Sequence, residues 1–299
     1  MSIEWGVLPA TVDLLGECPT WDGATQTLYW TDIPGKALKS WHPQSGLHRV
    51  WPMPEEVGSF ALRQRGGAVL ALRSGFALFD FTTRERTMLP SPANDRATMR
   101  FNDGRCGPDG RFYAGTMYEP RGRADGRLYR LDTDLTWSEL PDTSAIVSNG
   151  LAFSRDGTIM YHSDSAGRII NVHAFDAATG DIGPRRTFAT VPPPQERGGI
   201  DPGRPDGAAI DADGCYWSAM YEGRRIVRYA PDGVIERELS FPVQCPTMVC
   251  FGGENFDTLF VTTSRNGRPA AELARQPDAG KVFFAKVGVR GVEEPKFRG

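Results

Sequence analysis

The chain has 299 residues, of which 40% are hydrophobic and 24% charged, and its formal net charge is −3 at pH 7. These values are ordinary for a soluble globular protein, and the lack of a basic block or basic amphipathic helix argues against a partner such as nucleic acid. The sequence contains no run of about 18 apolar residues, so no membrane span is predicted.

The N-terminal stretch and the cysteines together predict a cytoplasmic protein. "MSIEWGVLPATVDLLGE" lacks the basic start and the apolar run of a signal peptide. The five cysteines are an odd number and include no C-x-x-C pair, which favours reduced thiols. The four histidines show no zinc-binding spacing such as H-E-x-x-H.

In chain order, the predicted elements are short strands that recur in six similar units. Runs rich in Val, Ile, Phe, Tyr and Trp are broken by Gly, Pro, Asp and Asn, and helix is expected only near "PAAELARQ". The first unit is "WDGATQTLYWTDIPGKALKSWHPQSG", and the last is "GGENFDTLFVTTS…GKVFFAKVG". The middle strands of the units begin near Leu28, Val69, Phe112, Ile159, Cys215 and Thr258, so successive units are offset by 41, 43, 47, 56 and 43 residues.

This period determines the expected fold. Several strands in each unit of about 40 to 50 residues are typical of a β-propeller. We therefore predict an all-β, six-bladed β-propeller that occupies residues 1–299 as a single domain. An all-β sandwich is the rival, but it gives no reason for a repeat at this period. The stretch from Ile3 to Leu14 precedes the first unit, and we expect it to close the ring as an outer strand near residues 280–288.

One position of the repeat, just before each inner strand, is polar in all six units. In five units a turn residue follows it seven places later, which gives a common register. The same position in the repeat means the same height around a propeller's axis, so these side chains should gather at one mouth of the central channel. We call this position the ring position and its six residues the ring residues, namely Glu17, Ser59, Asn102, Asn149, Asp206 and Thr247.

Three of these residues have the chemistry of a metal site. Glu17 and Asp206 are carboxylates and Asn149 offers an amide oxygen, and such hard donors suit Ca²⁺, Mg²⁺ or Mn²⁺. Two converging carboxylates would repel one another without a cation. Three protein ligands also leave positions open for water and substrate. Taken singly, each residue is better explained as a turn residue, so the hypothesis depends on the shared register and on the complementary chemistry.

Other aspartates of the repeats are interpreted as structural. Asp32 in "YWTD" and Asp164 in "YHSD" recur with the same neighbours, which indicates a repeated hydrogen bond. Asp213 stands in an Asp-Gly turn of the kind that most units need.

Several segments resemble the gluconolactonase, regucalcin and senescence-marker-protein family. "GECPTW" is similar to its G-E-x-P-x-W opening, "RFNDG" to its R-x-N-D segment, "SNGLAFSRDG" to its S-N-G motif and "RPDGAAIDADG" to its P-D-G motif. The resemblance runs from about residue 12 to 285, with the motifs in the expected order. Cys18 departs from the Gly or Ser of many relatives, and we interpret it as a packing variant because no motif supplies a neighbouring His.

The resemblance implies a six-bladed propeller that binds one divalent cation and hydrolyses a sugar lactone. It implies Glu17, Asn149 and Asp206 as metal ligands, with Asp206 also as general base, and Arg100 and Asn102 as substrate contacts. The sequence does not distinguish Ca, Mg, Mn, Fe and Zn, nor does it fix the sugar or the oligomeric state. Two alternatives stay open, namely a phosphotriesterase-like metal hydrolase and a non-catalytic calcium-binding propeller.

Two further places are candidates for substrate contact. Glu119, in "GTMYEP", is expected to close over the substrate. The segment "VPPPQERGGIDPGRP" is too rich in Pro and Gly for a blade strand and is predicted to be a loop beside the channel mouth. Its Arg197 and Arg204 are candidates for binding an anionic or heavily hydroxylated substrate, with solvated loop arginines as the alternative.

Overall fold

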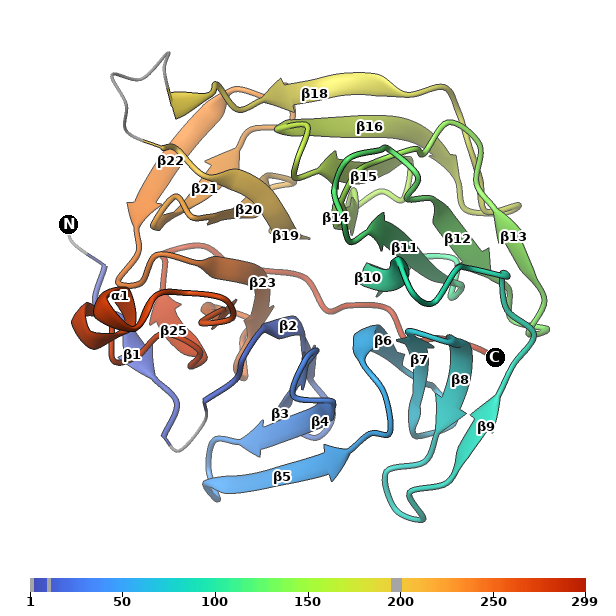
Figure 1. Ribbon diagram of the computed structural model, residues 1–299, viewed down its shortest axis with the longest axis horizontal. Helices are drawn as coiled ribbons and strands as arrows, with labels where there is room; N and C mark the ends of the chain where they lie inside the picture. Colours follow the sequence, from blue (N-terminus) through green and yellow to red (C-terminus); the bar gives the residue numbers. More distant parts are fainter. Residues whose placement is uncertain (1–2, 10–11, 195–200) are drawn as a thin grey trace.

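A computed structural model describes residues 3–9, 12–194 and 201–299. Six antiparallel sheets stand around a central axis, each with its first strand innermost (Figure 1). This is the all-β, six-bladed β-propeller that the repeat predicted. From the axis outward, blade one consists of β2 (Gly16–Asp22), β3 (Thr27–Asp32), β4 (Ala37–His42) and β5 (Leu47–Pro52). Blade two consists of β6 (Val57–Leu62), β7 (Ala68–Leu72), β8 (Gly75–Phe79) and β9 (Arg86–Met88). Blade three consists of β10 (Met99–Cys106), β11 (Phe112–Tyr118), β12 (Leu128–Leu131) and β13 (Trp137–Glu139).

The other three blades follow the same plan with two variations. In blade four both outer strands pair with β16, and in blade six the outermost strand comes from the N-terminal segment. Blade four consists of β14 (Ser148–Phe153), β15 (Ile159–Asp164), β16 (Ile169–Asp176), β17 (Asp181–Ile182) and β18 (Arg186–Thr190). Blade five consists of β19 (Arg204–Ile210), β20 (Tyr216–Tyr221), β21 (Arg225–Tyr229) and β22 (Ile235–Ser240). Blade six consists of β23 (Pro246–Gly252), β24 (Thr258–Thr263), β25 (Phe283–Lys286) and β1 (Gly6–Val7).

The apolar core lies between neighbouring blades. Inner and middle strands such as β2, β7 and β23 are buried along their whole length, whereas the outer strand β9 is exposed throughout. Aromatic rings bridge adjacent blades, as where Trp217 of β20 meets Phe251 of β23 with ring centroids 5.7 Å apart. Strands buried on both faces read as nearly continuous apolar runs, which is why the repeat was visible in the sequence.

The ring closes where the N-terminal stretch was expected to close it. β1 pairs with β25, with Gly6 opposite Phe284 and Val7 opposite Phe283. The pairing is confirmed, but the strand is far shorter than the stretch from Ile3 to Leu14. Leu8 continues the contact by donating its backbone N–H to Val282 O at 2.9 Å, and its fully buried side chain packs among Trp and Phe rings of blades one and six.

The expected helical turn is also present. α1 (Ala270–Arg275) has six residues and lies between β24 and β25. Within the described ranges, no helix has the length and apolarity that crossing a membrane would require.

An irregularity recurs in the inner strands next to the predicted ring position. In all six blades the ladder between the two innermost strands shifts register there, for example between Glu17 and Thr20, between Asn149 and Ala152, and between Pro205 and Ala208. A β-bulge bends its strand and re-aims the side chains beside it. The fold therefore turns the ring residues away from the regular pleat at a common height.

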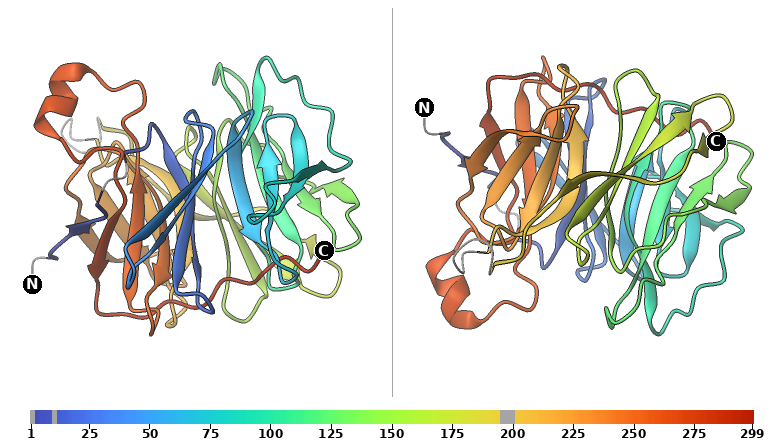
Figure 2. Two further views of the ribbon diagram at one scale, coloured as in Figure 1. Left: turned by 90° about the horizontal axis from the view of Figure 1, so that it is seen from below. Right: turned by 90° about the horizontal axis from the view of Figure 1, so that it is seen from above.

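The two ends of the channel differ. The mouth beside the ring residues is bordered by the loops that follow the second strand of each blade. On the opposite face, residues 290–299 cross beneath the blades, and their backbone bonds to turns of blades two, three, five and six (Figures 1 and 2). Glu294 of this segment forms an ion pair with Arg105. We call residues 290–299 the C-terminal strap.

Candidate active site

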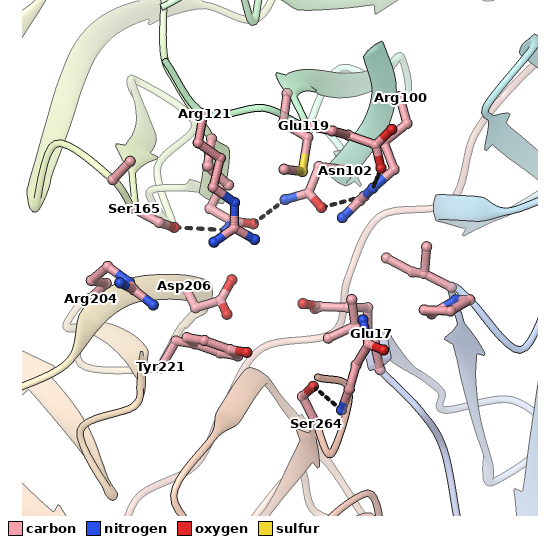
Figure 3. Close-up of a pocket in the computed structure, with 18 of the residues that line it drawn as sticks. Glu17, Arg100, Asn102, Glu119, Arg121, Ser165, Arg204, Asp206, Tyr221 and Ser264 are labelled. Carbon is pink, nitrogen blue, oxygen red and sulfur yellow. Dashed lines mark hydrogen bonds and ion pairs between the residues drawn. The ribbon is translucent and has the colours of Figure 1, made fainter. Parts of the chain in front are cut away.

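A cavity of about 360 Å³ lies at the mouth beside the ring residues (Figure 3). Its walls come from all six blades and are rich in charge. The charged and polar residues that line it are Glu17, Glu56, Arg100, Asn102, Glu119, Arg121, Asn149, Ser165, Arg168, Arg204, Asp206, Tyr221, Ser264 and Asn266.

Four of the six ring residues reach this cavity, namely Glu17, Asn102, Asn149 and Asp206. The other two are packed between blades. Ser59 is fully buried, and Thr247 donates its hydroxyl to Gly16 O at 2.5 Å. The common register thus brings together the three residues predicted as metal ligands, while the small hydroxyl side chains serve packing.

The carboxylates of Glu17 and Asp206 are buried in the cavity floor and face one another across it (Figure 3). Burial raises the pKa of Glu17 well above its usual range, and the charges of Asp206 and then Asp103 raise it further. Burial likewise raises the pKa of Asp206, with Asp103 adding to the shift and Arg204 and Arg121 opposing it. The protein alone therefore disfavours negative charge at this point.

Asn149 is held by a chain of hydrogen bonds. Its Oδ1 accepts from Asn102 Nδ2 at 2.8 Å, and its Nδ2 donates to Ser165 Oγ at 2.8 Å. Ser165 Oγ in turn donates to Pro205 O at 2.6 Å, in the residue before Asp206. These partners fix which end of the Asn149 amide is oxygen, and one lone pair of that oxygen remains available.

The three residues fit a divalent cation. Asp206 Oδ1 is buried and accepts no hydrogen bond from the described residues, which is costly for a carboxylate oxygen unless another group neutralises it. No group of three or more His, Cys, Asp or Glu side chains in the described ranges is arranged to hold a metal ion, so the Asn149 oxygen would be the third ligand beside Glu17 and Asp206. All three donors are oxygens, which suits Ca²⁺, Mg²⁺ or Mn²⁺.

Arg100, Asn102 and Glu119 lie together on one wall of the cavity. Arg100 Nη1 donates to Asn102 Oδ1 at 2.7 Å, and its Nε lies 3.5 Å from Glu119 Oε1. Glu119 also pairs with Arg73 at 2.8 Å, and the arginine contacts hold its pKa below the usual range. Asn102 Nδ2 is shared between Asn149 Oδ1 and Ser148 O, so its donors are already engaged. All three residues are placed at the cavity, and Asn102 is committed to orienting Asn149.

The predicted rim loop borders the same cavity in part. Arg204 lines it and forms an ion pair with Glu222. Arg197 lies outside the described residues. β19 begins at Arg204, so Pro205 belongs to an inner strand despite the Pro-rich sequence before it. This exception is possible because Pro205 precedes the bulge of β19, where the ladder is interrupted.

Cys18 occupies the turn of a bulge rather than a reactive position. Its backbone φ is +50°, in the left-handed region, as is that of Gly150 at +60° in the equivalent place after Asn149. Glycine adopts this conformation most easily, which explains why a Cys there departs from the usual residue. The thiol is buried and donates to Phe60 O at 3.2 Å, and burial raises its pKa, so it stays neutral.

Sequence reasoning missed several residues that line the cavity. Arg121, Ser165, Arg168 and Asn266 all follow the second strand of a blade. A signal was present, because the second strand runs antiparallel to the first and ends where the first begins. Residues just after each second strand must therefore lie at the same mouth as the ring residues.

Comparisons with known proteins identify relatives along almost the whole chain. Residues 15–265 match the family model described as SMP-30/Gluconolactonase/LRE-like region. A 6-deoxy-6-sulfogluconolactonase from Pseudomonas putida is 43% identical over 96% of each chain. An L-arabinolactonase from Azospirillum brasilense is 36% identical and covers 98% of this chain and 95% of its own.

A solved structure described as a calcium-binding protein, regucalcin, from Agrobacterium tumefaciens superposes with a TM-score of 0.92 at 28% identity. The superposition covers 100% of this chain and 99% of that one. The match of the family model over most of the chain and the identity of the bacterial relatives lead to one conclusion. The chain belongs to the SMP-30/gluconolactonase/LRE-like family.

Proposed function

We propose that this protein is a cytoplasmic hydrolase that opens a sugar lactone to the aldonic acid and uses one divalent cation. The observation that carries the proposal is the convergence of Glu17, Asn149 and Asp206 on one cavity, with Asp206 Oδ1 buried and free of hydrogen bonds from the described residues. The family and the names of two relatives, a sulfogluconolactonase and an arabinolactonase, support the substrate class.

Asp206 is the proposed general base. Its carboxylate takes a proton from water as the water oxygen bonds to the lactone carbonyl carbon. The ring C–O bond then breaks, and the same proton returns to the leaving ring oxygen, which becomes a hydroxyl of the product. When bound by Glu17, Asn149 and Asp206, a divalent cation supplies Lewis-acid stabilisation of the carbonyl oxygen.

Two residues on the opposite wall orient the substrate. Arg100 has N–H groups beyond those it donates to Phe101 and Asn102, and a planar guanidinium binds two neighbouring hydroxyl oxygens at once. Glu119 is fixed by Arg73 and Arg100, so it acts as a stationary acceptor for a sugar hydroxyl. Asn102 is a positioning residue that holds the Asn149 oxygen in place.

Two other functions are outcomes of the same test. A phosphotriesterase-like hydrolase would favour a less cationic pocket, whereas four arginines line this one. A non-catalytic calcium-binding propeller would bind the cation and turn over nothing, and one structural relative is described as a calcium-binding protein.

The test is an assay of ring opening on a panel of lactones. Gluconolactone, 6-deoxy-6-sulfogluconolactone, xylonolactone, arabinonolactone and galactonolactone are each offered with added Ca²⁺, Mg²⁺, Mn²⁺, Fe²⁺ or Zn²⁺ and with chelator. We expect hydrolysis of at least one lactone that chelator abolishes. In the Asp206→Asn variant, loss of the base should lower kcat by about 10²- to 10⁴-fold.

Asp213→Asn is the matched control, since Asp213 belongs to the same repeat but pairs with Arg228 outside the cavity. It should turn over like the parent protein. Full turnover by Asp206→Asn would refute the base assignment, and hydrolysis of a phosphotriester with none of any lactone would favour the alternative hydrolase. Cation binding without turnover would favour the non-catalytic module.

A further inference from the structure

The charges around the cavity are unevenly balanced. On the wall formed by blades two and three, Arg73 and Arg100 face Glu56 and Glu119 in one connected network. These two arginines and two carboxylates neutralise one another. The rest of the lining presents Arg121, Arg168 and Arg204 to the cavity, so its charge balance depends on the partners of these three residues.

Arg121 differs from the other arginines that line the cavity. Arg100 pairs with Glu119, Arg168 with Asp201 and Arg204 with Glu222. Arg121 forms no ion pair with any residue that the structure describes. Its guanidinium nevertheless points into the cavity toward Asp206 (Figure 3). An arginine in this position offers a planar set of N–H donors to a ligand.

The backbone holds Arg121 in an unusual conformation. Arg121 stands in the loop between β11 and β12, where its N–H donates to Tyr118 O at 2.9 Å. Its φ is +58°, in the left-handed region that residues with side chains disfavour. The glycine of this turn is the next residue, Gly122, which has open space around it. The turn thus places an arginine where glycine would be the easier residue, and it directs that arginine over the cavity.

Arg204 approaches the same space from the start of β19. Its guanidinium lies 5.5 Å from the centre of the Tyr221 ring, and its partner Glu222 is shared with Arg268. Arg268 also pairs with Glu272, so these two arginines and two carboxylates balance one another. Arg121, Arg204 and Asp206 line the cavity together, and the two arginines approach Asp206 from different sides (Figure 3). Two guanidinium groups therefore border one end of the cavity, and one of them, that of Arg121, forms no ion pair with the described residues.

We propose that Arg121 and Arg204 bind an oxyanion substituent of the substrate, namely a sulfonate, phosphate or carboxylate carried outside the lactone ring at carbon 6. This inference rests on the proposed lactonase function and deepens it. Guanidinium groups bind such oxyanions through pairs of N–H donors, whereas a neutral sugar hydroxyl would leave the positive charge of Arg121 unmatched.

The test compares lactones that differ only at carbon 6. Glucono-1,5-lactone is assayed beside analogues with a phosphate, sulfonate or carboxylate at that carbon, and kcat/KM is measured for each. For the wild-type protein we expect an anionic lactone to be preferred over the neutral one by about 10-fold or more. Because the anion takes no part in the bond changes, the preference should appear mainly in KM.

Arg121→Ala and Arg204→Ala should each lower the ratio of anionic to neutral kcat/KM by about 10- to 100-fold. Arg123→Ala is the matched control, because Arg123 lies in the same loop but pairs with Asp125 and rests over Tyr118 outside the cavity. It should keep the wild-type ratio. An unchanged ratio in both cavity variants, or a wild-type preference for the neutral lactone, would overturn the proposal.

A binding measurement separates this proposal from the lactonase function. Gluconate and its 6-phosphate and 6-sulfonate analogues are titrated by calorimetry in the presence of Mn²⁺. Tighter binding of an anionic analogue that Arg121→Ala abolishes supports the anion site even if no lactone is hydrolysed. Equal binding of all three ligands counts against the anion site even if neutral lactones are hydrolysed.

Discussion

At the scale of single residues, the buried pair of Glu17 and Asp206 has two consequences. Burial and mutual repulsion make negative charge costly in the protein alone, since the pKa of each is raised well above its usual range. A bound cation reverses this penalty because it attracts both carboxylates. A substitution that removes one of these carboxylates should therefore stabilise the protein without a cation and weaken its affinity for a cation.

Asp206→Asn tests this opposition without an activity assay. In the presence of chelator at pH 7, the variant should unfold at a higher temperature than the wild-type protein, because it no longer buries a second carboxylate beside Glu17. With Ca²⁺ or Mn²⁺ at about 100 times its Kd, the wild-type protein should gain about 2.7 kcal/mol, and the variant much less. Thermal unfolding monitored by circular dichroism measures both effects.

Asp213→Asn again serves as the control, and it should gain as much from the cation as the wild-type protein does. An Asp206→Asn variant that is stabilised by the cation to the same extent as wild type would show that the ion binds elsewhere.

The residues found from the sequence and those missed differ in one physical respect. Glu17, Asn149 and Asp206 were predictable because the inner strands repeat, and equal register places equal positions at one height. Arg121 stands in a loop whose length differs from blade to blade, so the strand order places it at the mouth but no register fixes the direction of its side chain. Pairing partners such as Arg73 for Glu119 depend on side-chain contacts between blades, which a single sequence does not reveal.

At the scale of elements, two devices set the geometry of the mouth. Each inner strand carries a register shift beside the ring position. The aspartates that end two of the second strands hold the entering chain: Asp32 Oδ1 accepts from Leu15 N, and Asp164 Oδ1 accepts from Val147 N, each at 3.1 Å. The repeated structural hydrogen bond predicted for these aspartates is confirmed. The bulges were not foreseen, because inner strands that are buried on both faces show no alternation of apolar and polar residues that an extra residue could interrupt.

The C-terminal strap was also not foreseen, because it belongs to no repeat. Phe297 is fully buried in a cluster with Phe101 and Phe112, and its N–H donates to Leu62 O at 2.8 Å. The strap therefore contributes apolar core to blades two and three. Its Glu294 also pairs with Arg105, which lies beneath the ring residues on β10.

Phe297→Ala should consequently lower the free energy of unfolding by about 3 to 5 kcal/mol, the usual cost of emptying a buried phenylalanine site. Phe297→Leu keeps most of the apolar volume and should cost less than about 1.5 kcal/mol. Urea unfolding followed by tryptophan fluorescence gives both values. A cost below 1 kcal/mol for the alanine variant would mean that the strap is only loosely attached.

At the scale of the whole molecule, the ring places a polar channel inside an apolar shell. Closure through β1 and β25 leaves blade six with four strands like most of its neighbours. Titratable groups are buried between the blades of this closed ring as well as at the mouth of the channel. His162 of β15 is one of them: it is 1% exposed, its Nε2 hydrogen-bonds Ser148 Oγ at 2.7 Å, and its Nδ1 has no partner among the described residues.

Burial lowers the pKa of His162 to about 3. The unfolded chain takes up a proton at this side chain below its ordinary pKa of about 6.5, whereas the folded protein does not until pH approaches 3. The stability linked to His162 is therefore complete above pH 6.5 and is lost progressively as the pH falls toward 3. Between pH 7 and pH 5 this loss amounts to about 2 kcal/mol.

His162→Gln keeps a polar group near Ser148 and removes the titration. At pH 7 the variant should be less stable than the wild-type protein, since the imidazole fits its buried site, but the difference should narrow by about 2 kcal/mol at pH 5. Urea unfolding at pH 7, 6 and 5 measures the difference directly, and acid-labile carboxylates elsewhere cancel because both proteins contain them. A difference that stays constant across this range would mean that the folded protein protonates His162 as readily as the unfolded chain does. The imidazole would then have to be accessible to water, in conflict with its place between β14 and β16.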